Sequence, residues 1–169
     1  VKGRQVDNAG WLRELVELVC ADRPALDQAE VFDRVLKREE AVTSLVEEGI
    51  AFPHAIIEGD VATTLAVGVS REGVSWEGHQ GPTKVHIVAL LIGSRAYHLG
   101  ALAELATRLR SRGLYERLLQ SNSSQEIYDG LLHFEPPVEA AGRFTSEITR
   151  LTFDHAARLA KEIPKARLV

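Results

Sequence analysis

The sequence contains no methionine, one cysteine and few aromatic residues, which make up 6% of its 169 positions. A lone cysteine excludes an internal disulfide, and the place of Cys20 beside Val16 and Val19 predicts the apolar face of a helix. Long hydrophobic runs are also absent, since no apolar stretch approaches the roughly 20 residues that span a bilayer. Membrane insertion is therefore not expected, and a start without a secretory signal indicates the cytoplasm. Because the chain opens on Val1, we expect it to be part of a longer polypeptide.

Basic residues are not in excess either. The chain has 20 Lys and Arg against 24 Asp and Glu, a net charge of −4, whereas domains that bind nucleic acid usually carry a basic surface. Protein or small-molecule partners are therefore expected, and nucleic acid is not. The six histidines lack cysteine co-ligands and a paired His-x-x-x-His, and nucleotide-binding loops and the nucleophile elbow of hydrolases are missing too. Neither a metal nor a cofactor is expected.

The apolar residues that are present predict helices, then strands, then further helices. Helical spacing, preceded in two cases by a capping-box pattern, marks four segments: residues 11–20, 27–39, 98–111 and 123–132. Short apolar stretches predict three strands: residues 50–52, 64–69 and 85–92. Residues 71–84, which hold Trp76, are predicted to be a connecting loop or a hairpin arm, with the tryptophan as a loop anchor. This order predicts an α/β layered fold with a mostly buried mixed sheet flanked by helices.

Composition also divides the chain. A first domain is expected over residues 5–134. Residues 135–143, which include two consecutive prolines, break every periodicity and are predicted to be a linker. Residues 144–169 are predicted to form a helix and the start of a further, truncated module. The segment after the linker should be dispensable for the folding of the first domain, because its apolar stripe matches nothing upstream.

One histidine has an unusual setting. Residues 49–55 read Gly-Ile-Ala-Phe-Pro-His-Ala, so that His54 follows a short apolar strand and a proline that fixes the backbone before it. An imidazole is a good nucleophile near neutral pH, and a phosphoryl group on its nitrogen remains transferable. On this local setting alone, a histidine at a strand end is more often structural than functional.

The surrounding residues make the setting more specific. Residues 49–55, together with Arg38-Glu39 and Thr43-Ser44 before them, resemble the active-site signature of the type-2 IIA domains of the bacterial phosphotransferase system. That family includes the mannitol, fructose and nitrogen-regulatory proteins. Residues 73–76 are similar to its Gly-hydrophobic-x-aromatic loop, and His98-Leu99 with the following helix resembles its second histidine. The matches extend in order over roughly residues 12–132, which is more specific than any single motif.

The resemblance implies a function and three roles. In the family, the histidine that matches His54 accepts a phosphoryl group from a histidine phosphocarrier protein and donates it to a IIB domain or protein. The histidine that matches His98 supports the phosphate, and the arginine that matches Arg38 compensates its charge. The residue types agree, because a helix N-terminus favours an anion and a guanidinium can bind phosphate oxygens. Partners are expected to dock on an apolar rim around His54.

Some positions depart from the family, and other interpretations stay open. Glu47-Glu48 replaces the usual Gly-Asn, and each carboxylate would oppose a phosphate if it pointed inward. The acidic pair Glu39-Glu40 is expected to be solvated. Arg38 also fits an ordinary cation at a helix C-terminus, and His98 a polar residue at a helix start. The alternatives to a phosphoryl carrier are a regulatory protein-binding module, phosphorylation-controlled or vestigial, fused to a downstream domain, and a purely structural interaction domain.

Overall fold

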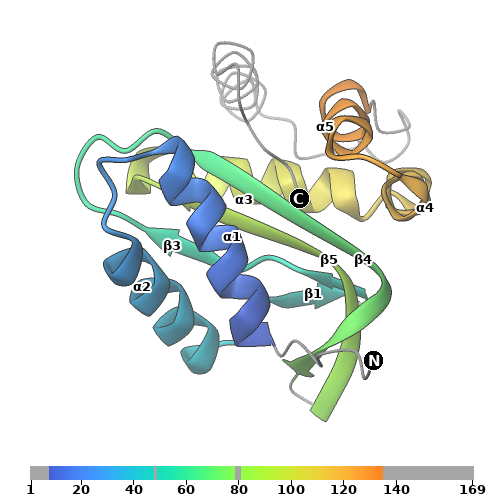
Figure 1. Ribbon diagram of the computed structural model, residues 1–169, viewed down its shortest axis with the longest axis horizontal. Helices are drawn as coiled ribbons and strands as arrows, with labels where there is room; N and C mark the ends of the chain where they lie inside the picture. Colours follow the sequence, from blue (N-terminus) through green and yellow to red (C-terminus); the bar gives the residue numbers. More distant parts are fainter. Residues whose placement is uncertain (1–7, 48, 79–80, 135–169) are drawn as a thin grey trace.

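The computed structural model describes residues 8–47, 49–78 and 81–134. Within these ranges the chain forms five helices and five strands (Figure 1). In chain order they are α1 (Asn8–Asp22), α2 (Gln28–Ala41), β1 (Leu45–Glu47), β2 (Gly49–Ala51), β3 (His54–Ile56), β4 (Thr64–Gly78), β5 (Gly81–Gly93), α3 (Arg95–Leu109), α4 (Arg112–Gln120) and α5 (Ser124–His133). The predicted α/β class is confirmed. No helix in the described ranges has the length and apolar character needed to cross a membrane.

A single mixed sheet is organised around β5. This strand pairs antiparallel with β4 along most of its length. It also pairs parallel with β2 and, further along, with β3. Among the described strands, β1 pairs with β2 only. In the described part of the chain, β3 is therefore an edge strand with one strand neighbour.

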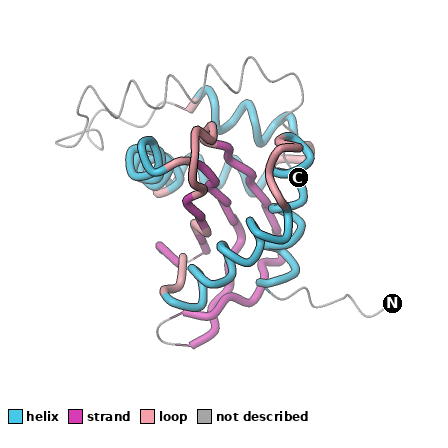
Figure 2. Tube along the Cα trace, turned by 90° about the vertical axis from the view of Figure 1, so that its left-hand side faces the viewer, coloured by secondary structure: helices cyan, strands magenta, loops and turns pink. Residues whose placement is uncertain are grey.

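The sheet lies between two layers of helices (Figures 1 and 2). On one face α1 and α2 pack against Val88, Leu90 and Ile92 of β5. On the other face α3, α4 and α5 pack against Ile87 and Ala89 of the same strand. Successive residues of β5 thus enter opposite cores, which is why this strand is an unbroken apolar run in the sequence.

Both predicted capping boxes provide the N-cap hydrogen bond at a helix start. The Asp27 side chain accepts a hydrogen bond from the Glu30 backbone N–H at 2.8 Å, and the Ser123 hydroxyl accepts one from the Glu126 N–H at 3.2 Å. Each bond satisfies an N–H group that has no partner inside its helix. Cys20 is half-buried against the first core, as its spacing predicts, and burial raises the pKa of its thiol.

Residues 71–78 and 81–84 form the paired arms of a long β4–β5 hairpin, so the hairpin option is correct for them and the loop option is wrong. Trp76 is fully buried on β4 in the first core, which corrects its interpretation as a loop anchor. The strand is hard to recognise because its pairing register shifts between Val69 and Val74, where Gly73 adopts a φ of 73°. Such a bulge interrupts the alternation by which strands are detected.

Three elements are not predicted by the sequence patterns: β1, β3 and α4. The two strands have three residues each, which is too short for a period to appear. His54, expected at the end of a strand, begins β3 instead. α4 buries only Leu114 and Leu118 and is otherwise rich in charge.

The described chain ends at Phe134, whose carbonyl accepts a hydrogen bond from Arg108 Nη1 at 2.7 Å. Arg108 is itself paired with Glu104 at 2.8 Å, so the end of α5 is held against α3. The predicted linker at 135–143 and the predicted module at 144–169 lie outside the described residues.

Candidate functional site

His54 is the first residue of β3, just after the chain has left β2, and both strands pair with β5. Pro53 separates β2 from β3, and its carbonyl still accepts a hydrogen bond from the Leu91 N–H of β5 at 3.0 Å. Phe52 packs in the core beneath α3–α5, whereas Ala55 packs in the core beneath α1 and α2. Because strand residues alternate between faces, His54 lies on the α3–α5 face with Phe52. The half-buried imidazole is therefore at an edge, on the face where α3 begins.

The imidazole is oriented by its own backbone. Nδ1 of His54 lies 3.1 Å from the carbonyl oxygen of Phe52. A carbonyl only accepts hydrogen bonds, so this contact requires a proton on Nδ1. In the neutral ring, Nε2 then carries the lone pair. The geometry thus selects one of the two tautomers, with Nε2 as the basic nitrogen.

Helix α2 runs alongside the outer edge of β3, in the opposite direction. Near its middle, Arg34 Nη1 donates to the Ile56 carbonyl at 3.4 Å. Just beyond its end, the Ser44 carbonyl accepts a hydrogen bond from the Phe52 N–H at 2.9 Å. Residues at and beyond the end of α2 are therefore next to the residues just before β3, and the middle of α2 is next to the end of β3.

This arrangement places Arg38 close to the level of His54. Arg38 follows Arg34 by four residues, about 6 Å along a helix axis. His54 precedes Ile56 by two residues, about 6–7 Å along a strand. Since the two elements are antiparallel, these displacements have the same direction and nearly the same length. Residues 16 positions apart in the sequence are thereby brought to a similar level along this edge of the sheet.

The guanidinium of Arg38 is exposed, and its Nη1 donates to the Val42 carbonyl at 3.3 Å. Val42 is the C-cap of α2, so the contact also satisfies a backbone carbonyl at the end of the helix. This is the contact that the alternative interpretation of Arg38 predicts. A guanidinium has five N–H donors, so one long hydrogen bond leaves donors for an anion.

His98 occupies the first turn of α3, directly after β5. The end of β5 pairs with the end of β3, Gly93 with Ile56, so α3 begins beside the strand that carries His54. The structure thus brings the α3 N-terminus to this edge of the sheet. The side chain of His98 lies outside the described residues, as do Glu48 and the side chain of Glu47.

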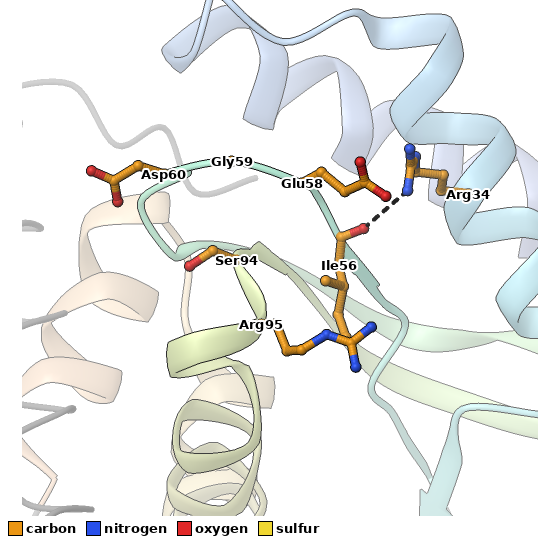
Figure 3. A pocket seen from close by; sticks show the side chains of 7 residues that line it. All are labelled: Arg34, Ile56, Glu58, Gly59, Asp60, Ser94 and Arg95. Atoms are coloured by element: carbon orange, nitrogen blue, oxygen red, sulfur yellow. Dashed lines mark hydrogen bonds between the residues drawn. The ribbon is translucent and has the colours of Figure 1, made fainter.

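A cavity of about 610 Å³ opens at the far end of β3 (Figure 3). Arg34 of α2 and Arg95 of α3 lie on either side of Ile56, and Glu58 lies next to Arg34. The cavity is lined by Arg34, Ile56, Glu58, Gly59, Asp60, Ser94 and Arg95. Two carboxylates offset two guanidinium groups, so the lining has no net positive charge that would favour an anion.

Glu39 has a role that the sequence does not reveal. The pair Glu39-Glu40 is predicted to be solvated, which is correct for Glu40 and wrong for Glu39. The half-buried Glu39 carboxylate accepts hydrogen bonds from Trp76 Nε1 at 2.8 Å and from the Ser44 N–H at 2.9 and 3.1 Å. These partners come from β4 and from the loop after α2, which no local pattern connects.

Comparison with known proteins bears on this site. The family model described as "Phosphoenolpyruvate-dependent sugar phosphotransferase system, EIIA 2" matches residues 6–133. A fructose-specific EIIABC component of Bacillus subtilis strain 168 is 33% identical over 131 residues, which are 76% of this chain and 20% of that protein. A nitrogen regulatory protein of Bradyrhizobium diazoefficiens is 32% identical over 126 residues, which are 72% of this chain and 80% of that protein. The chain thus spans a fifth of the first relative and most of the second.

Solved structures show the same fold. The crystal structure of the nitrogen regulatory protein IIA-Ntr from Neisseria meningitidis superposes with a TM-score of 0.65 at 24% identity, covering 74% of this chain and 86% of that one. The enzyme IIAMTL of Escherichia coli, in a complex with phosphorylated enzyme IIBMTL, gives a TM-score of 0.63 at 20% identity, covering 77% and 91% of the two chains.

Proposed function

Because the chain belongs to the EIIA type-2 family of the phosphoenolpyruvate-dependent sugar phosphotransferase system, we propose that it is a cytoplasmic phosphoryl carrier. His54 accepts a phosphoryl group from a histidine phosphocarrier protein and passes it to a IIB-type acceptor. The observation that carries the proposal is the hydrogen bond between Nδ1 of His54 and the Phe52 carbonyl, which leaves Nε2 as the nucleophile.

The proposed step is an in-line displacement at phosphorus. Nε2 of His54 forms a bond to phosphorus while the bond between phosphorus and the donor's imidazole nitrogen breaks, and that imidazole leaves with the electron pair. Nδ1–H stays bonded to the Phe52 carbonyl, so no proton has to be removed for His54 to attack. In transfer to the acceptor, a nucleophile of the acceptor forms the bond to phosphorus while the bond from phosphorus to Nε2 of His54 breaks, and the imidazole keeps the electron pair. The protein therefore contributes position and charge compensation.

Arg38 and His98 are the proposed sources of that compensation. Arg38 lies at the level of His54 on the neighbouring helix, and its guanidinium can turn from the Val42 carbonyl to phosphate oxygens with little loss. His98 is in the first turn of a 15-residue helix, where free N–H groups and the helix dipole favour an anion.

The partner surface proposed for the site is an apolar rim. Among the described residues, the large hydrophobic side chains with substantial exposure are Val42 at 49% and Ile56 at 36%. Val42 follows the helix that carries Arg38, and Ile56 is on the strand that starts at His54. Exposed apolar side chains of this kind on two sides of a reactive group suit a small, transient interface.

A regulatory role is the second candidate. The relatives include both fructose-specific components and nitrogen regulatory proteins, at 33% and 32% identity for the two described above. In this version the phosphorylation state of His54 is the signal, and the output is contact with a regulatory target or a downstream domain. The two versions share the phosphohistidine and differ in whether the phosphoryl group moves on. The IIA–IIB mannitol complex of Escherichia coli supports transfer to a IIB protein.

The test is phosphorylation with phosphoenolpyruvate, enzyme I and the phosphocarrier protein, followed by acid lability and mass analysis. We expect one acid-labile phosphoryl group on the parent and on His133→Ala, a control that removes an exposed histidine at the end of α5. His54→Ala should take up none, and label retained by this variant would contradict the assignment. Adding a IIB protein then separates the two roles, since only a carrier loses its label to IIB.

A further inference from the structure

Glu39 joins two elements of the fold through one carboxylate. Its Oε1 accepts a hydrogen bond from the indole N–H of Trp76, which is fully buried on β4. Its two oxygens together accept the backbone N–H of Ser44. Hydrogen bonds to an ionised acceptor are stronger than those between neutral groups, and the indole is held by the core around it. The start of the α2–β1 loop is thereby tied to the sheet.

From Ser44 the connection continues to His54 through two further hydrogen bonds. The Ser44 carbonyl accepts the Phe52 N–H at 2.9 Å, and the Phe52 carbonyl accepts Nδ1–H of His54 at 3.1 Å. The bonds from Ser44 and Phe52 each hold the backbone N–H of a residue whose own carbonyl accepts the next bond. The plane and the tautomer of the imidazole therefore depend on where the peptides of the loop lie.

The same loop also holds Arg38. The guanidinium donates to the Val42 carbonyl, and Val42 lies between Glu39 and Ser44, the two residues that the carboxylate joins. Arg38 is itself the neighbour of Glu39 in the last turns of α2. A shift of this loop would thus move the arginine and the histidine relative to each other.

We propose that Glu39 is a positioning residue for the phosphoryl transfer, which fixes the Nδ1–H tautomer of His54 and its register with Arg38 without touching the phosphate. The part about transfer rests on the proposed function, while the part about the imidazole does not. A glutamine at this position has one acceptor oxygen. With the amide oxygen in the place of Oε1, the bonds from Trp76 and Ser44 to that atom remain, but the amide nitrogen faces the Ser44 N–H where Oε2 now accepts at 3.1 Å, so this second bond becomes a contact between two donors.

The test compares Glu39→Gln with Glu40→Gln, which removes the same charge at the neighbouring exposed position. The ¹⁵N chemical shifts of the His54 ring report the tautomer, and initial rates with the phosphorylated phosphocarrier protein give kcat and KM. In Glu39→Gln we expect a mixed tautomer and a kcat lower by about 10- to 100-fold with little change in KM, as small misplacements of a reacting group cause. Glu40→Gln should match the parent in both measurements.

A purely structural role predicts a lower melting temperature for Glu39→Gln with parental ring shifts and kcat, and that result would overturn the proposal. If Glu39→Gln does not fold, Trp76→Phe removes the indole donor and leaves the carboxylate, and it must then change the ring shifts and kcat in the same direction. If the parent protein takes up no phosphoryl group, the proposed function fails. The ring shifts then decide about Glu39, since unchanged shifts in the variant would refute the positioning role.

Discussion

Replacing Arg38 with alanine should separate catalysis from stability. In the resting protein the side chain is exposed and makes one hydrogen bond, 3.3 Å from Nη1 to the Val42 carbonyl. An exposed substitution changes the free energy of unfolding by less than about 0.5 kcal/mol, and losing a cation at a helix C-terminus adds about 0.3–1 kcal/mol. The expected loss is therefore about 1 kcal/mol, which lowers the melting temperature by only a few degrees.

The effect on transfer should be much larger, because charge arrives at His54 only in the phosphorylated state and in the transition state. Removing one group that stabilises developing charge commonly slows a reaction by about 10²–10³-fold, equivalent to about 2.7–4 kcal/mol. Arg38, at the level of His54, is the cation proposed to compensate that charge. The expected loss of transition-state stabilisation is thus about three times the expected loss in the free energy of unfolding.

The assay measures the initial rate of phosphorylation from a fixed concentration of phosphorylated phosphocarrier protein, with calorimetry on the same samples. Lys37→Ala is the matched control, because Lys37 directly precedes Arg38 on α2 and has the same charge. Its ammonium group forms an exposed ion pair with Asp33 at 2.7 Å. An exposed pair of this kind contributes little to stability. Equal rates for Arg38→Ala and Lys37→Ala, or a parental rate for Arg38→Ala, would refute the reasoning.

Three other outcomes are expected. His98→Ala should melt near the parent yet transfer about 10²–10³-fold more slowly, whereas a parental rate would leave His98 an ordinary helix-start residue. Gly49→Ala should destabilise the protein by about 1–3 kcal/mol, since Gly49 has a φ of 88° and a Cβ there would lie 2.5 Å from the Tyr115 hydroxyl oxygen. In a double-mutant cycle, Tyr115→Phe should recover part of this loss. Strictly additive effects of the two substitutions would contradict the clash. A chain ending near Glu135 should unfold cooperatively with nearly the parental midpoint, and a large drop in calorimetry would mean that the later residues pack on the domain.

Local chemistry made much of the fold predictable. The caps at Asp27 and Ser123 depend on residues three positions apart, and the unbroken apolar run of β5 identifies a strand covered on both faces. β1 and β3 escaped prediction because three residues do not display a period. The burial of Trp76 could not be predicted because its partner, Glu39, is 37 positions away.

The candidate site was less predictable from local patterns than the fold. His54 and Arg38 were found by resemblance to a family, since neither residue has a local setting that distinguishes function from structure. Their similar level along the edge of the sheet follows from the antiparallel course of α2 and β3, which is a property of the assembled fold. Glu39 was interpreted as a surface acid because a pair of glutamates near a helix end usually is solvated. Only the hydrogen bonds of its carboxylate show otherwise.

The alternation of residues around His54 has a consequence for how the protein opens. Phe52 belongs to the core of α3–α5 and Ala55 to the core of α1 and α2, so the strand segment with the imidazole is shared by both. If each layer is a cooperative unit in hydrogen exchange, opening either one removes the packing from one side of this segment. The backbone amides of β3 then become accessible to exchange through whichever layer opens more easily. The exchange rates of the amides next to His54 would then report on the less stable of the two helical layers.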